Sequence, residues 1–216
     1  FVPPDIFIPL AEQIGVIVDL GTWVLDVACQ ELARWAAIPA MAHLVMAVNV
    51  SPQQFQLPGF VAAVLDALAR AGARPDRLKL ELTESVLIQD LSFVRQSMAT
   101  LKAQGVGFAL DDFGTGYSSL KYLKQLALDQ LKIDQSFVAD VMTDSHDAAI
   151  ARTIVTLGHS LGLQVIAEGV ETVAQRDFLL SIGCNIFQGY LYSEPLAAKA
   201  FEDFAAIQQR GANAQA

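Results

Sequence analysis

Short apolar runs of strand length alternate with helical patterns through most of the chain. Apolar residues recur at helical spacing between these runs, as in the segment 150–161. The repeated order of strand, polar loop and helix predicts β/α units with parallel strands. The six runs with the length and aliphatic character of buried strands are Leu44–Val50, Leu78–Glu84, Gly107–Asp112, Gln130–Asp134, Gln164–Gly169 and Asn185–Tyr190.

Polar residues and glycines mark where the predicted helices begin and end. Ser51–Gln54 and Thr172–Gln175 have the capping-box pattern of a helix start. Residues 1–40 show no strand pattern and predict a short helix near Pro4–Gln13 and a longer one near Leu20–Ala37. Glycines that follow a helical run and precede a strand are expected to be left-handed C-caps, namely Gly72, Gly105, Gly162 and Gly183.

No low-complexity linker interrupts this pattern, which indicates one domain over residues 1–207. The polar segment 208–216 is expected to be a frayed tail.

The composition excludes several classes of protein. With 14 basic and 23 acidic residues, the net charge is −9, so the chain lacks the basic surface that binds DNA, RNA or an anionic membrane. The longest uncharged apolar stretch, Ala36–Val48, is interrupted by Pro39 and His43 and is too short to span a bilayer. We expect a cytoplasmic domain with reduced cysteines, although the parent protein could still be membrane-tethered.

Every predicted strand ends in or beside a polar side chain. In a barrel of parallel strands the carboxyl ends meet at one mouth, where an active site forms. Oxygen donors suit Mg²⁺ or Mn²⁺ rather than zinc, and more than three carboxylates indicate two ions. The side chains expected at this mouth are Asn49, Glu81, Asp111, Asp112, Lys132, Glu168 and Gln188.

A simpler explanation is that acidic residues at strand ends only cap the next helix. It would account for one such residue, but it accounts poorly for polar residues at all six strand ends. It also leaves Lys132, a single amine among acids, unexplained. Lys132 would place a point charge on a phosphate or on the attacking water.

These motifs resemble those of the EAL-domain family, the bacterial cyclic di-GMP phosphodiesterases. The resemblance runs from the first residue to about Phe204. It rests on the segments Phe7–Glu12, Asn49–Ser51, Glu81–Glu84, Asp111–Ser119, Lys132–Asp134, Glu168–Glu171 and Gln188–Tyr190.

The resemblance implies a TIM-like (β/α)₈ barrel of EAL type, whose first strand is antiparallel to the rest. Only six strand patterns are present in this chain. The Glu-Ala-Leu signature that ends the second strand of the family is expected just before residue 1. We therefore expect an N-terminally incomplete EAL domain that is fused to upstream regulatory domains.

The resemblance also assigns roles at the site. Lys132 contacts the nucleophilic water, and Glu168, Asp111 and Asp112 act with it as catalytic residues. Two ions, Mg²⁺ or Mn²⁺, are implied, with Asp112 reaching the second. The implied metal ligands are Asn49, Glu81, Asp111, Asp112 and Glu168.

The remaining implied roles concern substrate and assembly. Gln188, Glu171 and Asp134 are implied to bind substrate. Glu84 is implied to anchor the loop Asp111–Ser119, which in the family links the metals to a homodimer interface.

The implied reaction is metal-dependent hydrolysis of cyclic di-GMP to linear pGpG. The alternative is a degenerate EAL domain that binds cyclic di-GMP as a receptor without cleaving it. A Glu at the signature position would favour the enzyme, and a Val, Lys or Gln there would favour the receptor. An unrelated Mg²⁺-dependent barrel enzyme would have no reason to carry the Asp111–Ser119 sequence.

Overall fold

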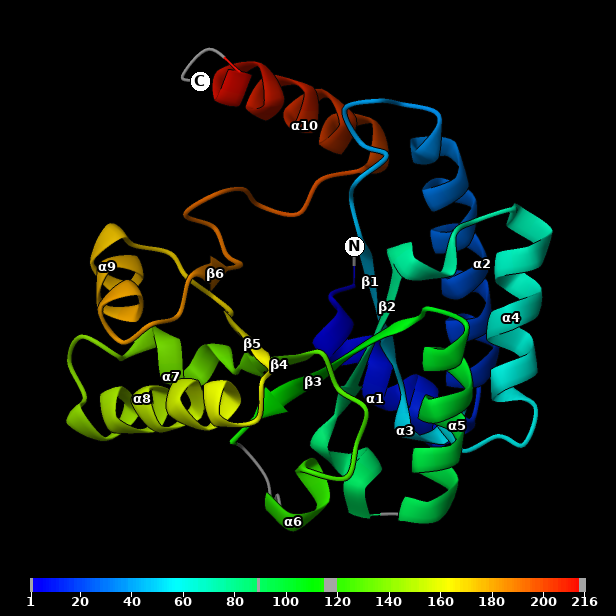
Figure 1. The fold of residues 1–216 in the computed structure, drawn as a ribbon, viewed down its shortest axis with the longest axis horizontal. Coiled ribbons are helices and arrows are strands. Elements are labelled where there is room, and N and C mark those ends of the chain that lie inside the picture. Colours follow the sequence, from blue (N-terminus) through cyan, green and yellow to red (C-terminus); the bar gives the residue numbers. More distant parts are fainter. Residues whose placement is uncertain (1, 89, 115–119, 214–216) are drawn as a thin grey trace.

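The fold is an α/β arrangement around one parallel sheet (Figure 1). The computed structural model describes residues 2–88, 90–114 and 120–213 of the chain. Each strand pairs in parallel with the next in sequence, which confirms the predicted β/α units. The strands are β1 (Met46–Val50), β2 (Leu78–Thr83), β3 (Gly107–Phe113), β4 (Gln130–Ile133), β5 (Gln164–Ala167) and β6 (Ile186–Phe187).

Helices pack on the outer face of the sheet in two groups. In Figure 1, α2, α4 and α5 lie together on one side of the strands, and α7, α8 and α9 lie on the other. Two short 3₁₀ turns, η1 (Pro75–Arg77) and η2 (Glu84–Ile88), flank β2. The α-helices are α1 (Pro4–Ile14), α2 (Ile17–Ala36), α3 (Pro52–Phe55), α4 (Phe60–Ala71), α5 (Leu91–Ala103), α6 (Leu120–Leu123), α7 (Gln135–Ala139), α8 (Ser145–Ser160), α9 (Val173–Ser181) and α10 (Ala198–Asn213).

Alternate residues of each strand face two different environments. Leu80 and Leu82 of β2 are buried beneath α2, α4 and α5, in a core that also contains Val48 and Val50 of β1. Glu81, between the two leucines, faces the opposite side of the sheet. A second core joins β4 and β5 to α8 and α9. The helix-facing side is therefore apolar, and the polar strand residues gather on the inner side.

Local capping follows the sequence prediction. The Ser51 side chain accepts a hydrogen bond from the Gln54 amide, and Thr172 and Gln175 form a complete capping box. All four glycines expected at helix ends have positive φ, namely Gly72, Gly105, Gly162 and Gly183.

The last strand is shorter than its apolar run predicts. β6 covers only Ile186–Phe187, because the chain beyond it leaves the regular ladder. The Gln188 amide donates to the Ala167 carbonyl, and the Gln188 carbonyl accepts from Val170. These bonds join the loop after β6 to the loop after β5.

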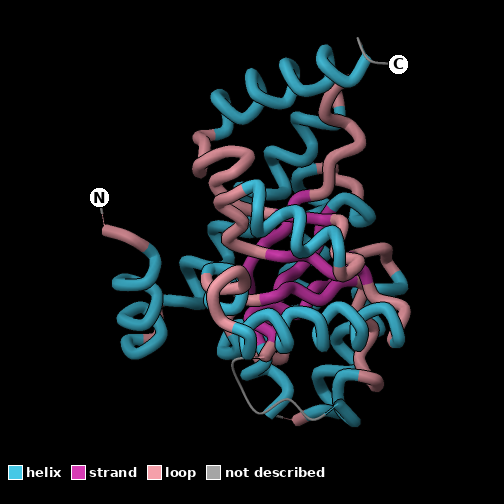
Figure 2. Tube along the Cα trace, turned by 90° about the vertical axis from the view of Figure 1, so that its left-hand side faces the viewer, coloured by secondary structure: helices cyan, strands magenta, loops and turns pink. Residues whose placement is uncertain are grey.

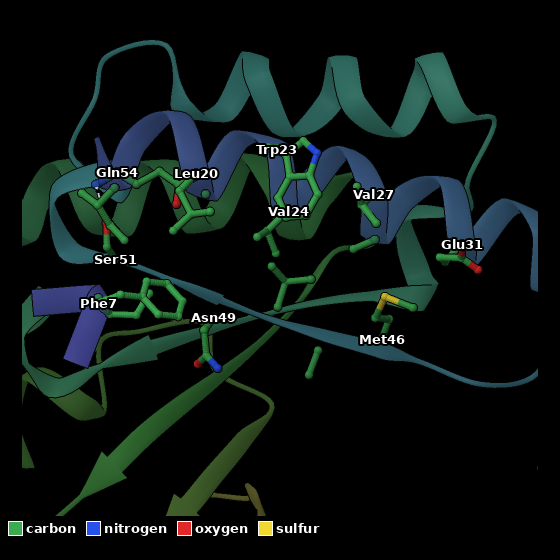
Figure 3. Close-up of a pocket in the computed structure, with 16 residues that line it drawn as sticks. Phe7, Leu20, Trp23, Val24, Val27, Glu31, Met46, Asn49, Ser51 and Gln54 are labelled. Carbon is green, nitrogen blue, oxygen red and sulfur yellow. Dashed lines mark hydrogen bonds between the residues drawn. The ribbon is translucent and has the colours of Figure 1, made fainter. Parts of the chain in front are cut away.

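The N-terminal side of the sheet is open. Among the described residues, β1 pairs only with β2, so its other edge has no strand beside it. An apolar groove of about 530 Å³ lies along β1 and is lined by α1 and α2 (Figure 3). Trp23 of α2 lines this groove and is 62% exposed. Figure 2 shows α1 at the margin of the molecule, away from the central strands.

Helix α10, near the C-terminus, packs against α2 in the N-terminal part of the chain. Phe201 contacts the Trp35 ring, and Glu202 forms an ion pair with Arg34. The helix extends to Asn213, within the segment 208–216 that we expect to be a frayed tail. In the described part of the chain, no helix has the length and apolarity needed to cross a membrane.

Candidate active site

The Lys132 amine lies at the centre of a buried group of carboxylates. Lys132 extends inward from β4 and is only 2% exposed. Its Nζ atom lies 2.8 Å from Glu81 Oε2, 3.0 Å from Asp111 Oδ2 and 2.7 Å from Glu168 Oε1. Four consecutive strands, β2 to β5, thus bring one cation and three anions together at their carboxyl ends.

Lys132 is a permanent positive charge in this setting. Burial alone would lower the pKa of its amine, but the charges of Glu81, Asp111 and Glu168 outweigh burial and raise it. A protonated amine can donate hydrogen bonds and supply a point charge.

A backbone irregularity turns two consecutive carboxylates towards the same place. Strand pairing between β3 and β4 shifts register between Leu110 and Phe113, and Asp112 has a φ of +54°. In a regular strand, Asp111 and Asp112 would point to opposite faces. The bulge instead leaves carboxylate oxygens of Asp111, Asp112 and Glu168 within 4.8 Å of one another.

Two carboxylates of this cluster, Glu168 and Asp112, have a raised pKa. Burial raises the pKa of Glu168 to about 7, although the bond to Lys132 opposes the shift. Burial, followed by the charges of Asp111 and Asp134, raises the pKa of Asp112 to about 6. One lysine thus compensates this cluster incompletely, and an added cation would be favourable.

The donor set fits a hard divalent cation. All three clustered groups offer carboxylate oxygen, which suits Mg²⁺ or Mn²⁺. Asn49 of β1 is the register partner of Glu81 and so lies beside it on the inner face. Its amide oxygen would extend the oxygen donor set towards the open edge of the sheet.

Other predicted site residues follow strands at the same end of the sheet. Asp134 caps α7 by accepting from the Ser136 amide, as the simpler capping explanation predicts for an acidic residue at a strand end. Its charge nevertheless influences Asp112, so it also belongs to the electrostatic surroundings of the site. Glu171 and Gln188 are exposed. The Glu171 backbone amide donates to Gln175 Oε1, and the Gln188 backbone amide donates to the Ala167 carbonyl.

Glu84 contacts the start of the loop that follows β3. It is 7% exposed, and its Oε1 atom accepts a hydrogen bond of 2.9 Å from the Gly114 amide. Residues 115–119, the rest of the predicted Asp111–Ser119 loop, lie outside the described residues.

Two features of the site did not emerge from the sequence. The influence of Asp134 on Asp112 depends on the bulge in β3, which no local pattern announces. Gln175 was identified only as a helix cap, although its amide also reaches α7. The residue type was a clue in the sequence, because capping leaves the two side-chain N–H donors of a glutamine unused.

Comparisons with known proteins agree on one family. The EAL domain model matches residues 1–195. The chain is 46% identical over 198 residues to the bifunctional diguanylate cyclase/cyclic di-GMP phosphodiesterase MucR of Pseudomonas aeruginosa, covering 92% of this chain and 29% of MucR. It spans about a quarter to a third of the length of the curated relatives it matches.

Solved structures give the same result. The MucR phosphodiesterase in complex with cyclic di-GMP superimposes with a TM-score of 0.89 at 46% identity, covering 93% of this chain and 81% of that one. Klebsiella pneumoniae BlrP1, in a complex with manganese and cyclic di-GMP, gives 0.77 at 31% identity, covering 91% of this chain and 49% of that one. The fold with its parallel sheet is therefore that of TIM-barrel-like EAL domains.

Proposed function

This chain belongs to the EAL domain family, and we propose that it hydrolyses one phosphodiester bond of cyclic di-GMP to give linear pGpG in bacterial signalling. The observation that carries the proposal is the buried Lys132 amine among Glu81, Asp111 and Glu168. The phosphodiesterase name of MucR and its solved complex with cyclic di-GMP support the same substrate.

We propose that two divalent cations, Mg²⁺ or Mn²⁺, bind at the carboxylate cluster. Asp112 would serve the second ion, at the bulge that turns it towards Asp111. When bound, these ions would lower the pKa of a coordinated water and polarise the scissile phosphate. The residues that would hold them are Asn49, Glu81, Asp111, Asp112 and Glu168.

Lys132 would stabilise negative charge that develops during the reaction. Its Nζ donates to carboxylates from three strands, so the amine is fixed in position before substrate arrives. A fixed donor costs little reorganisation in the transition state, where charge develops on the attacking and phosphate oxygens. Glu168 would orient this amine and, with Asp111 and Asp112, complete the catalytic group.

Substrate binding would use the strand ends next to this cluster. We propose that Gln188, Glu171 and Asp134 contact the nucleotide, since they follow β6, β5 and β4 at the same end of the sheet. Asp134 also keeps its capping bond to α7 in this proposal.

We further propose a cytoplasmic homodimer within a larger protein that carries regulatory domains. Glu84 would anchor the dimer-forming loop through Gly114. Sedimentation of the intact protein should give a dimer at micromolar concentration. A fully active monomer under those conditions would contradict this assembly.

The competing function is a receptor that binds cyclic di-GMP without cleaving it. The test is product analysis after incubation with cyclic di-GMP, first with a chelator and then with Mn²⁺ or Mg²⁺ restored. We expect pGpG only when the ion is present. Tight binding without product at any ion concentration would identify a receptor, and full turnover in excess chelator would exclude the metal mechanism.

A further inference from the structure

We propose that Gln175 is a positioning residue that holds the loop carrying Glu168 against helix α7 and thereby fixes the geometry of the carboxylate cluster. This inference rests on the proposed function, because the cluster is the proposed catalytic site. Gln175 lies on the first turn of α9, outside that cluster.

The Gln175 side chain uses its full hydrogen-bonding capacity. It is 7% exposed. Its Oε1 atom accepts from the amides of Glu171 and Thr172, each at 2.9 Å. Its Nε2 atom donates to the carbonyls of Val138 and Ala139, each at 3.2 Å. A primary amide has two donors and two main acceptor sites, so no capacity remains unused.

These four bonds connect helix α7 to the loop after β5. Helix α7 begins at Gln135, three residues after Lys132, and its last residues are Val138 and Ala139. Glu171 and Thr172 lie on the loop that follows β5 and begins with Glu168. Gln175 therefore links the segment that follows Lys132 in the chain to the segment that follows Glu168.

The same two segments are also packed tightly at their other ends. The Glu168 amide donates to the Ile133 carbonyl at 3.2 Å. A Cβ atom on Gly169 would lie 2.7 Å from Gln135 Cβ, so the chain passes α7 with room only for glycine. The loop is thus held to the β4–α7 segment at its start by backbone contacts and at its end by Gln175.

The loop after β6 joins this assembly. The Val170 amide donates to the Gln188 carbonyl at 3.0 Å, and the Leu191 amide donates to the Val170 carbonyl at 3.0 Å. A Cβ atom on Gly189 would lie 2.3 Å from the Val170 backbone. Movement of the β5 loop would therefore also displace Gln188, a proposed substrate contact.

Capping alone does not explain a glutamine at this position. A capping box needs only an acceptor that reaches back to the N-cap amide, and glutamate serves as well as glutamine. Only an amide can also donate to the two carbonyls of α7. The Nε2 group of Gln175 is therefore the part that positions the loop.

The test compares variants of the intact protein that separate the acceptor and donor groups of the Gln175 side chain. Gln175→Glu keeps the acceptor for the cap and loses the donors to α7. Gln175→Asn keeps an amide that is one methylene too short to bridge to α7. Thr172→Ala is the matched control. It removes the hydroxyl that accepts from the Gln175 backbone amide, but it leaves the bonds from the Gln175 side chain to α7 in place.

We expect both Gln175 variants to lose about 10- to 100-fold in kcat with little change in KM, the range typical of residues that orient ligands from outside. Titration calorimetry should show weaker Mn²⁺ binding in the same variants. Thr172→Ala should lower the melting temperature and leave kcat and Mn²⁺ affinity unchanged.

Two outcomes would overturn the proposal. One is wild-type kcat and Mn²⁺ affinity in Gln175→Glu. The other is an equal loss of kcat in Thr172→Ala and Gln175→Asn when both variants have the same drop in melting temperature. That result would show that Gln175 has a purely structural role. A wild-type protein that never forms pGpG would instead refute the proposed function, while the calorimetry would still test the positioning.

Discussion

Two regions of the sheet differ in how well they enclose their inward-facing side chains: the region of β4 and β5, the enclosed end, and the β1 edge, the open end. All four residues of β4 are buried, and the loops after β4, β5 and β6 are joined by hydrogen bonds. In β1, Ala47 and Asn49 are exposed, and an apolar groove follows the strand. The proposed catalytic amine belongs to the enclosed end, and one proposed metal ligand, Asn49, belongs to the open end.

This difference shows that the site is organised unevenly. Lys132 and Glu168 are held by neighbours on both sides, so their geometry is set within the described residues. Within the part of the chain that the structure describes, Asn49 has a strand neighbour on one side only, and the site at that end depends on what covers the edge of β1. The predictions below test each end, from the largest expected effect to the smallest.

The largest effect should come from covering the open end. We expect residues 1–216 expressed alone to be poorly soluble or misfolded and inactive on cyclic di-GMP, because the β1 edge and its apolar groove are exposed to solvent. A longer version that includes an upstream segment ending in Glu-Ala-Leu, or a close variant, should fold and hydrolyse cyclic di-GMP. Circular dichroism melts and a nucleotide assay compare the two. Normal turnover and a cooperative melt from residues 1–216 would contradict this prediction.

Removing the amine at the enclosed end should have the next largest effect. Lys132→Ala should lower kcat by about 10²- to 10³-fold, the loss typical of a fixed transition-state donor, with KM little changed. Lys124→Ala, at an exposed lysine, is the control and should behave like the wild type. A raised KM with kcat unchanged would show that Lys132 serves ground-state binding instead.

Gly169→Ala tests the tight packing at the enclosed end. The added methyl group would collide with Gln135 and would also occupy a φ of +64°, so we expect a loss of about 2–3 kcal/mol in unfolding free energy. Gly72→Ala is a matched control, since its φ is +68° and its surroundings are empty. Denaturant melts should show that Gly169→Ala is the more costly, and equal losses would mean that the contact with Gln135 is unimportant.

Asp112→Asn should have the smallest effect, and it should be stabilising without metal. The pKa of Asp112 is raised from 3.8 to about 6, so the native state binds this proton more tightly than the unfolded state. Native stability therefore falls as the pH rises from about 4 to about 6, and the penalty remains above that range. Asn tolerates the positive φ and removes the charge.

Metal-free melts should therefore show Asp112→Asn about 1 kcal/mol more stable than the wild type at pH 7.5, after allowance for partial solvent screening. The difference should vanish near pH 4. A constant difference between these pH values would mean that the Asp112 charge is not its cause.

Much of this arrangement could be predicted because the strands are aliphatic and their polar ends share one edge. The pattern around Leu80 and Leu82 identified β2, and the parallel order then brought Glu81 towards Lys132. The bulge at Asp112 could not be predicted, because a positive φ at a non-glycine residue is determined by tertiary packing. The bridge from Gln175 to Val138 depends on the spacing of two helices, which local sequence does not encode.

The open groove also contains an intrinsic fluorescence probe, Trp23. The chain has two tryptophans, and they differ in environment: Trp23 lines the groove at 62% exposure, whereas Trp35 is 8% exposed beneath α10. Indole fluorescence shifts to shorter wavelength when water is excluded from the ring. Any segment that covers the β1 edge would therefore change the emission of Trp23 and leave that of Trp35 unchanged. The emission maximum of Trp23 thus reports whether the open end of the sheet is covered.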